Sequence, residues 1–139
     1  MFQHILVPTD LSEKSRRALD IAVKLALQDG SRITLLHVVE TIEDADYNEF
    51  DAFYLSLGKR SWKKMEKMLG PYEGKGLVAE KEVTYGKRVK EIIQFARDHE
   101  IDLIVLSSHK VDAESLSQGW GTISYQVGLL SPCPVMLVK

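Results

Sequence analysis

Short apolar runs alternate with stretches of helical periodicity along the whole chain, and this alternation constrains the fold more than any other feature. The apolar runs are nearly continuous, as in strands that are buried on both faces of a sheet. Between them, apolar residues recur at helical spacing, which indicates helices with one buried side. The order β-α-β-α-β-α-β-α-β predicts an α/β fold, namely a single doubly wound domain with a five-stranded parallel sheet and four helices on both faces. The predicted strands are residues 5–7, 33–39, 77–83, 101–106 and 134–138.

Turn residues and polar clusters separate these elements. Ser12 is a candidate N-cap for the first helix, and Gly30 is expected to end it. Residues 41–53 are acidic and aperiodic, which predicts a loop or an irregular helix start. The second helix is then expected to run from Phe53 to the Gly70-Pro71 stop.

The later elements carry two further signals. The third strand contains Glu80, Lys81 and Glu82, and this polarity indicates a strand at the edge of the sheet. The third and fourth helices are predicted to begin at Gly86 and Gly121.

Composition narrows the class of protein. A length of 139 residues predicts one domain over residues 1–139. The fractions of hydrophobic (45%) and charged (27%) residues are those of an ordinary soluble globular domain. The net charge of −2 gives no reason to expect nucleic acid or a membrane as a partner. Since no signal peptide or apolar run of transmembrane length is visible, and the single cysteine is Cys133, we expect a cytoplasmic protein.

The expected strand order, 3-2-1-4-5, predicts the place of a ligand site. In a doubly wound sheet the direction of winding reverses beside the first strand, and ligands bind outside the carboxyl ends of the strands at that point. The crevice is therefore predicted between Pro8-Thr9-Asp10, after the first strand, and Leu106-Ser107-Ser108, at the end of the fourth.

A second segment, Gly121-Thr122-Ile123-Ser124, favours an anion at the same place. A helix N-terminus offers free N–H groups and a favourable dipole to an anion. The glycine permits close approach, and the hydroxyl groups can donate to phosphate oxygens. Simple capping of the helix by Thr122 is the structural alternative, and it is compatible with anion binding.

Together these segments resemble the universal stress protein family over the whole chain. The resemblance implies a five-stranded α/β domain that pairs into a homodimer. It also implies that ATP or a related adenine nucleotide is a candidate ligand, since some members bind one and others do not. The resemblance rests on residues 4–12, 36–39, 101–106, 121–124 and 131–138, which read HILVPTDLS, LHVV, IDLIVL, GTIS and SPCPVMLV.

The phosphate loop of this family departs from its usual pattern here. In nucleotide-binding members it reads Gly, two residues, Gly, nine residues, then Gly-Ser or Gly-Thr. The matching positions are Ser107, Lys110, Gly121 and Thr122, with ten residues between Lys110 and Gly121. A Cβ at Ser107 would narrow the space for a phosphate, and a positive φ there would add strain of about 1–2 kcal/mol. Lys110 would be either a point-charge clamp on phosphate or a solvated loop lysine.

The resemblance also implies two residues at the adenosine end. Asp10 would lie near the adenosine, and Val39 would use its main chain against adenine. The residues themselves leave alternatives open, because Asp10 beside Pro8 is also a turn former and Val39 also reads as a plain buried strand residue. Trp120 could stack on a ligand, close the crevice or pack at a dimer surface.

The C-terminal strand predicts self-association. Residues 134–138, from Pro134 to Val138, are apolar and uncharged, and such an edge is an aggregation hazard unless it is covered. Pairing with its twin around a two-fold axis covers the edge. The resemblance implies the same mode of homodimerisation.

Three functions compete at this point. The first is a small stress-linked binding protein that holds an adenine nucleotide weakly or in an altered pose and passes that state to an unidentified protein partner. The second is a dimerisation or interaction module with a decayed phosphate loop. The third, a slow ATPase or autokinase, is not favoured, because the chain has neither a P-loop Gly-Lys-Ser/Thr nor a recognisable Ser-His-Asp set. No metal of its own is predicted, because the four histidines are scattered and no acidic or cysteine cluster has ligand spacing.

Overall fold

The fold is described from a computed structural model, which describes residues 1–42, 47–108 and 123–139. Strands and helices alternate along these residues as predicted, with one short 3₁₀ turn, η1, added after the second helix. The strands are β1 (His4–Pro8), β2 (Arg32–Glu40), β3 (Val78–Gly86), β4 (Leu103–Ser107) and β5 (Val135–Val138). The helices are α1 (Glu13–Asp29), α2 (Tyr47–Leu69), α3 (Arg88–Asp98) and α4 (Ile123–Leu130), and η1 is Gly70–Tyr72.

The five strands form one parallel sheet in the order β3-β2-β1-β4-β5, which confirms the predicted order. β1 lies at the centre, with Ile5 opposite Ile33 of β2 and Leu103 of β4. The polar third strand is an edge strand, as its charges indicated, and β5 is the other edge.

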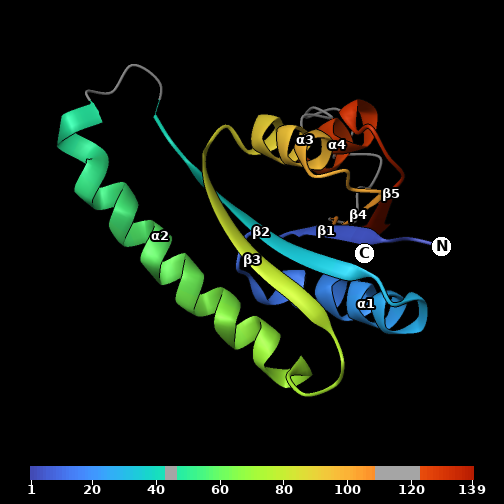
Figure 1. The fold of residues 1–139 in the computed structure, drawn as a ribbon. Coiled ribbons are helices and arrows are strands. Elements are labelled where there is room, and N and C mark those ends of the chain that lie inside the picture. The colour runs from blue at the N-terminus through green and yellow to red at the C-terminus, as the bar shows by residue number, and fades with distance from the viewer. Residues whose placement is uncertain (43–46, 109–122) are drawn as a thin grey trace.

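Two helices cover each face of the sheet (Figure 1). Along β1, Ile5 and Val7 pack towards α1 and α2, whereas Leu6 packs towards α3 and α4. All three side chains are fully buried, so the central strand has no solvent face and its continuous apolar sequence is explained.

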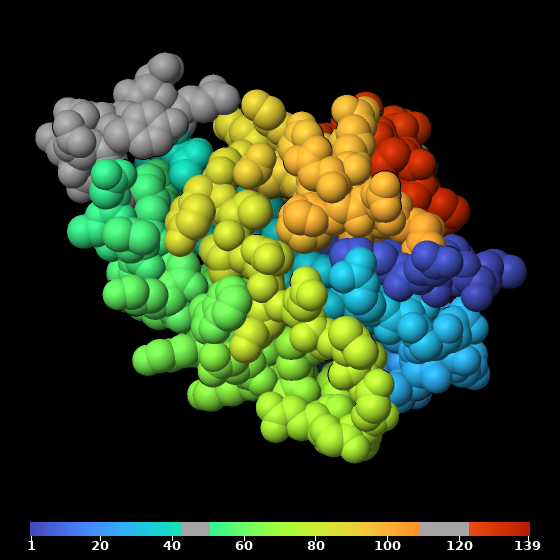
Figure 2. All heavy atoms as spheres, in the orientation of Figure 1, coloured from blue at the N-terminus to red at the C-terminus, as the bar shows by residue number. Residues whose placement is uncertain are grey.

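The long helix α2 lies alongside β3 in both overall views (Figures 1 and 2). Met65 and Met68 anchor it in the core. On the outside, Lys81 of β3 lies 3.4 Å from Glu66 and 4.8 Å from the ring centroid of Trp62, both on α2. These contacts are consistent with the charged sequence of β3, because its lysine pairs with the neighbouring helix.

The predicted element boundaries were wrong in several places. α2 begins at Tyr47, so much of the acidic segment 41–53 is helical. Gly86 was expected to open a helix, but it is the last residue of β3. The strand extends this far because β3 pairs with β2 residue by residue up to Glu40. Ser12 occupies the N-cap position of α1, but its side chain makes no capping hydrogen bond. The predicted helix start at Gly121 lies outside the described residues.

Gly86 has a φ of +151°, which a residue with a side chain adopts only with strain. A Cβ at this position would also lie 3.1 Å from Cγ of Glu91. We therefore expect Gly86→Ala to lower the free energy of unfolding by about 1–3 kcal/mol, measured by urea denaturation. Gly70→Ala is the matched control, because Gly70 lacks a positive φ and a Cβ there meets nothing within 4 Å. Equal stability of the two variants would contradict the expectation.

Candidate functional site

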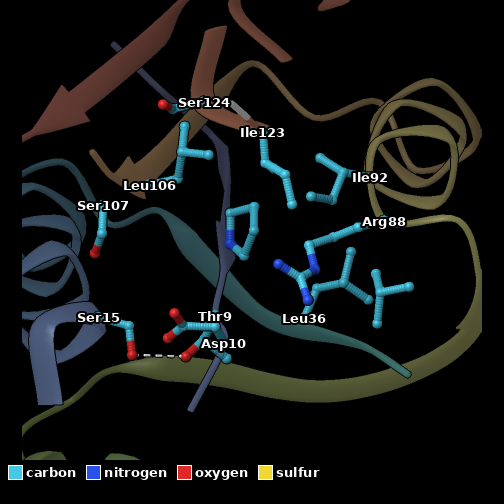
Figure 3. A pocket seen from close by; sticks show the side chains of 12 residues that line it. Thr9, Asp10, Ser15, Leu36, Arg88, Ile92, Leu106, Ser107, Ile123 and Ser124 are labelled. Atoms are coloured by element: carbon cyan, nitrogen blue, oxygen red, sulfur yellow. Dashed lines mark hydrogen bonds between the residues drawn. The ribbon is translucent and has the colours of Figure 1, made fainter. Parts of the chain in front are cut away.

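A cavity of about 270 Å³ opens at the carboxyl ends of β1 and β4, where the sequence predicted a crevice (Figure 3). It is bounded by β1, β2 and β4, by the first turns of α3 and α4, and by α1. The predicted site residues that line it are Pro8, Thr9, Asp10, Leu106, Ser107, Ile123 and Ser124. The lining residues that were not predicted are Ser15, Leu36, Val38, Arg88 and Ile92.

The remaining predicted residues lie elsewhere. Ser108 lines an adjoining cavity of about 570 Å³, together with Lys14, Arg17 and Lys139. Val39 is buried and lines a third cavity, between β2 and α2, whereas its neighbour Val38 lines the crevice. Lys110, Gly121 and Thr122, like Trp120, lie outside the described residues.

One part of the crevice is apolar. Leu36 and Val38 of β2 and Ile92 of α3 pack in one core cluster, and Ile123 of α4 packs against it. These side chains form apolar walls, and the same cavity is also lined by the polar residues Asp10, Ser107 and Ser124. Apolar walls with a few convergent polar groups are typical of small-molecule sites.

Thr9 holds the turn that forms the floor of the crevice. Its Oγ1 donates to Oγ of Ser15 at 2.8 Å and accepts the N–H of Leu11 at 3.0 Å. Ser15 in turn donates to the carbonyl of Ser12 at 2.6 Å. The hydroxyl of Thr9 is thus engaged by the protein, so Thr9 positions the turn and offers a ligand little beyond its carbon atoms.

Asp10 both forms the turn and faces the cavity, so the two readings of its sequence position are compatible. Oδ1 accepts the N–H of Ser12 at 2.9 Å, which is a turn of the kind that Asp favours. Partial burial pushes the pKa of Asp10 upward, but hydrogen bonds from Ser12 and the charge of Arg88 outweigh it, and the pKa is lowered. The carboxylate is therefore ionised at neutral pH.

Arg88 is the most informative residue that the sequence analysis missed. Its side chain extends from the start of α3 towards the centre of the crevice (Figure 3). Nε lies 3.7 Å from Oε1 of Glu40, the last residue of β2. In a parallel sheet with crossover helices, the first turn of each helix lies near the carboxyl ends of the strands. That rule could have identified Arg88 and, one turn later, Ile92.

His37 of β2 supports the same turn. Its Nδ1 donates to the carbonyl of Thr9 at 2.8 Å. Burial lowers the pKa of His37, and the charges of Arg88 and Lys64 lower it further. The hydrogen bond to Thr9 and the charge of Asp10 raise the pKa, but they do not offset the lowering. The imidazole is therefore neutral at pH 7, with the proton on Nδ1.

This lowered pKa predicts a loss of stability in mild acid. The unfolded chain takes up a proton near the ordinary pKa of 6.5, while the folded state keeps His37 neutral to lower pH. The free energy of unfolding should thus fall as the pH drops below about 6.5 and level off below the folded pKa.

His37→Asn keeps a donor for Thr9 and should reduce the pH slope of the free energy of unfolding between pH 7.5 and 5 by up to about one proton. Urea denaturation across this range measures the slope; an unchanged slope would contradict the assignment. His4, whose pKa burial also lowers, should leave a residual slope.

Ser107 does not carry the strain that a positive φ would impose. Among described residues other than glycine, φ is positive only at Leu11 and Glu100, and Ser107 ends β4 as a regular strand residue. Its Oγ donates to the carbonyl of Lys14 at 3.2 Å. The Cβ still occupies space that a glycine would leave open.

The two ends of the predicted phosphate loop meet. Oγ of Ser108, just after β4, lies 3.5 Å from Oγ of Ser124, in the first turn of α4. The end of β4 and the start of α4 thus lie side by side at the polar side of the crevice. Among the described residues, no group of three or more His, Cys, Asp or Glu could hold a metal ion. The helices described here include none with the length and apolar character needed to cross a bilayer.

Comparison with known proteins gives one consistent family. The model of the universal stress protein family matches residues 1–139. Universal stress protein YxiE of Bacillus subtilis is 29% identical, over 100% of both chains. The structure of protein MJ0577 of Methanocaldococcus jannaschii has a TM-score of 0.83 at 28% identity, covering 100% of this chain and 96% of that one. A universal stress protein family structure from Arabidopsis thaliana with AMP bound has a TM-score of 0.71 at 21% identity, covering 99% and 91%. These likenesses confirm the predicted fold.

Proposed function

The chain belongs to the universal stress protein family, and from this premise we propose that it binds an adenine nucleotide in the crevice beside β1 and β4. One observation carries the proposal. Apolar walls and a polar rim with an ionised carboxylate meet in a single cavity at the switch point of the sheet. An unidentified protein partner would then recognise the nucleotide-bound form.

The proposed pose follows from the chemistry of the lining. Adenine lies between Val38 of β2 and Ile92 of α3, where a flat aromatic ring gains most from apolar contact. The ribose hydroxyls donate to the carboxylate of Asp10. The phosphate then lies towards Ser107 and the start of α4 at Ser124, where helix N–H groups and hydroxyls favour an anion.

A relative supports the choice of nucleotide. The Arabidopsis protein of the same fold has AMP bound. In this chain, Ser107 replaces a loop glycine and its side chain takes up space at the phosphate end. We therefore propose that short phosphate groups fit better, so that AMP or cyclic AMP binds more tightly than ATP.

Calorimetric titration tests this function. AMP, cyclic AMP, ADP and ATP are each titrated into the protein at neutral pH. The proposal expects binding of AMP in the micromolar range and weaker binding of ATP. No heat with any of the four at millimolar concentration would contradict it and would favour an interaction module with a decayed phosphate loop. Mass spectrometry of freshly purified protein adds a second readout, since a co-purified adenine nucleotide agrees only with the proposal.

We also propose that the chain is a cytoplasmic homodimer paired through β5. Met136 and Leu137 are 36% and 39% exposed, although both belong to an apolar edge strand. The carbonyl of Pro134, just before β5, accepts the N–H of Ile104 at 3.0 Å, and the carbonyl of Val138 in β5 accepts the N–H of Ser108 at 2.8 Å. Because strand residues alternate, the backbone groups of Val135 and Leu137 point away from β4, and we propose that they pair with a second copy.

A further inference from the structure

A third cavity, of about 380 Å³, lies between the end of β2 and helix α2. We call it the α2-side cavity, and its polar lining comprises His37, Glu40, Arg60, Ser61, Lys64 and Arg88. It shares three lining residues with the crevice, namely Asp10, Val38 and Arg88. His37 and Val39, which line it, alternate along β2 with Leu36 and Val38, whose side chains belong to the core on the α3 and α4 side. The α2-side cavity therefore extends from the end of β2 over the face of β2 opposite the proposed adenine position.

Positive charge converges on this cavity from two elements. Arg60 and Lys64 are four residues apart on α2, so they project from the same side of the helix. Arg88 enters from the start of α3, and its charge lowers the pKa of both Asp10 and His37. Like charges at this helical spacing repel each other, which is a reason to expect a counter-ion.

The negative groups around the cavity are already engaged. Asp10 accepts the N–H of Ser12 at 2.9 Å, and Glu40 lies 3.7 Å from Arg88. Within the described part of the chain, no hydrogen bond or ion pair is found for the side chains of Arg60 and Lys64. Three cations therefore face two carboxylates, and the two cations on α2 have no protein partner there.

His37 adds a hydrogen-bond acceptor for a protonated oxygen of an anion. Its Nδ1 proton is held by the carbonyl of Thr9, so Nε2 carries a lone pair at neutral pH. Nε2 can accept a hydrogen bond from the O–H of a hydrogen phosphate. Arginine supplies paired N–H donors and lysine a point charge, and both are common partners of phosphate.

We infer that the α2-side cavity binds a phosphate group, which is held by Arg60, Lys64 and Arg88 between the end of β2 and helix α2. The group is either free inorganic phosphate or a second phosphate on a nucleotide whose adenosine occupies the crevice. The site is distinct from the phosphate position proposed above, beside Ser107 and Ser124.

Titration with inorganic phosphate, followed by ³¹P NMR and calorimetry, tests the inference. Arg60→Gln combined with Lys64→Gln should weaken phosphate binding at least tenfold. Lys59→Gln combined with Lys63→Gln removes the same charge from the same helix at residues that do not line the cavity, and should leave binding within about twofold. Arg60→Gln alone is a second variant in case the double variant fails to fold. Absence of phosphate binding to the unmodified chain, or equal loss in both double variants, would overturn the site.

Two further arms identify the source of the phosphate. If the phosphate belongs to a nucleotide, adenosine 3′,5′-bisphosphate should bind more tightly than AMP, and only the bisphosphate should lose affinity in the Arg60 and Lys64 variant. If it is free, inorganic phosphate should bind equally well with and without saturating AMP. Either result supports the site. Because AMP is titrated separately, failure of the crevice and failure of the α2-side cavity are read independently.

Discussion

Replacing Asp10 with alanine is expected to weaken AMP binding by about 10- to 100-fold, because the ribose hydroxyls lose a charged hydrogen-bond acceptor. Asp10 lines the crevice and is ionised at neutral pH. Alanine also removes the acceptor for the N–H of Ser12, so some loss of folding stability is expected as well. Affinity is measured by calorimetry at a temperature where the variant is fully folded.

Asp10→Asn separates the two roles of this carboxyl group. The amide oxygen can still accept the N–H of Ser12, so stability should change little, while the loss of charge should weaken AMP binding by a smaller factor than alanine does. Asp20→Asn is the matched control, since Asp20 is an acidic residue on α1 that does not line the crevice. Unchanged affinity in both Asp10 variants would contradict the proposed pose. Tighter binding in Asp10→Asn would place the nucleotide phosphate, rather than the ribose, beside Asp10.

Replacing Leu137 with proline is expected to convert the homodimer into a monomer. Leu137 pairs with Leu106 in the register of β5 and β4, but its own backbone N–H points away from β4 by the alternation of the strand. Proline therefore removes a donor at the open edge and leaves the hydrogen bonds to β4 in place. We expect the dissociation constant to rise at least 100-fold, measured by light scattering after size-exclusion chromatography and by sedimentation.

Leu137→Val is the control for this prediction, because it keeps both the N–H group and an apolar side chain. It should remain dimeric at the concentration where Leu137→Pro is monomeric. A monomeric unmodified chain, or a dimer that persists in Leu137→Pro, would contradict pairing through β5 and would direct attention to the exposed Leu129 and Leu130 of α4.

The fold was predictable because its signals are local. The continuous apolar runs around Leu6, Leu35 and Ile104 are typical of strands buried on both faces, and their alternation with helices indicates a parallel sheet. The boundaries that failed depend on pairing in space. Gly86 remains in β3 because it lies opposite Glu40, and no sequence pattern records that partner.

The candidate site was predictable only where its residues follow strands. Asp10 and Ser107 stand at strand ends, where turn-forming and polar residues interrupt an apolar run. Leu36, Val38 and Ile92 look like ordinary core residues in the sequence, and Arg88 looks like an ordinary helix cation. These residues line the crevice because the carboxyl end of β2 and the first turns of α3 lie beside the end of β1. No pattern in the sequence records that proximity.

The most direct test of the nucleotide site is NMR of methyl-labelled protein saturated with AMP. We expect intermolecular NOEs between the adenine H2 and H8 protons and the methyl groups of Leu36, Val38, Ile92 and Ile123. AMP that binds and shows its NOEs to other methyl groups, with none to these four, would contradict the crevice as the nucleotide site.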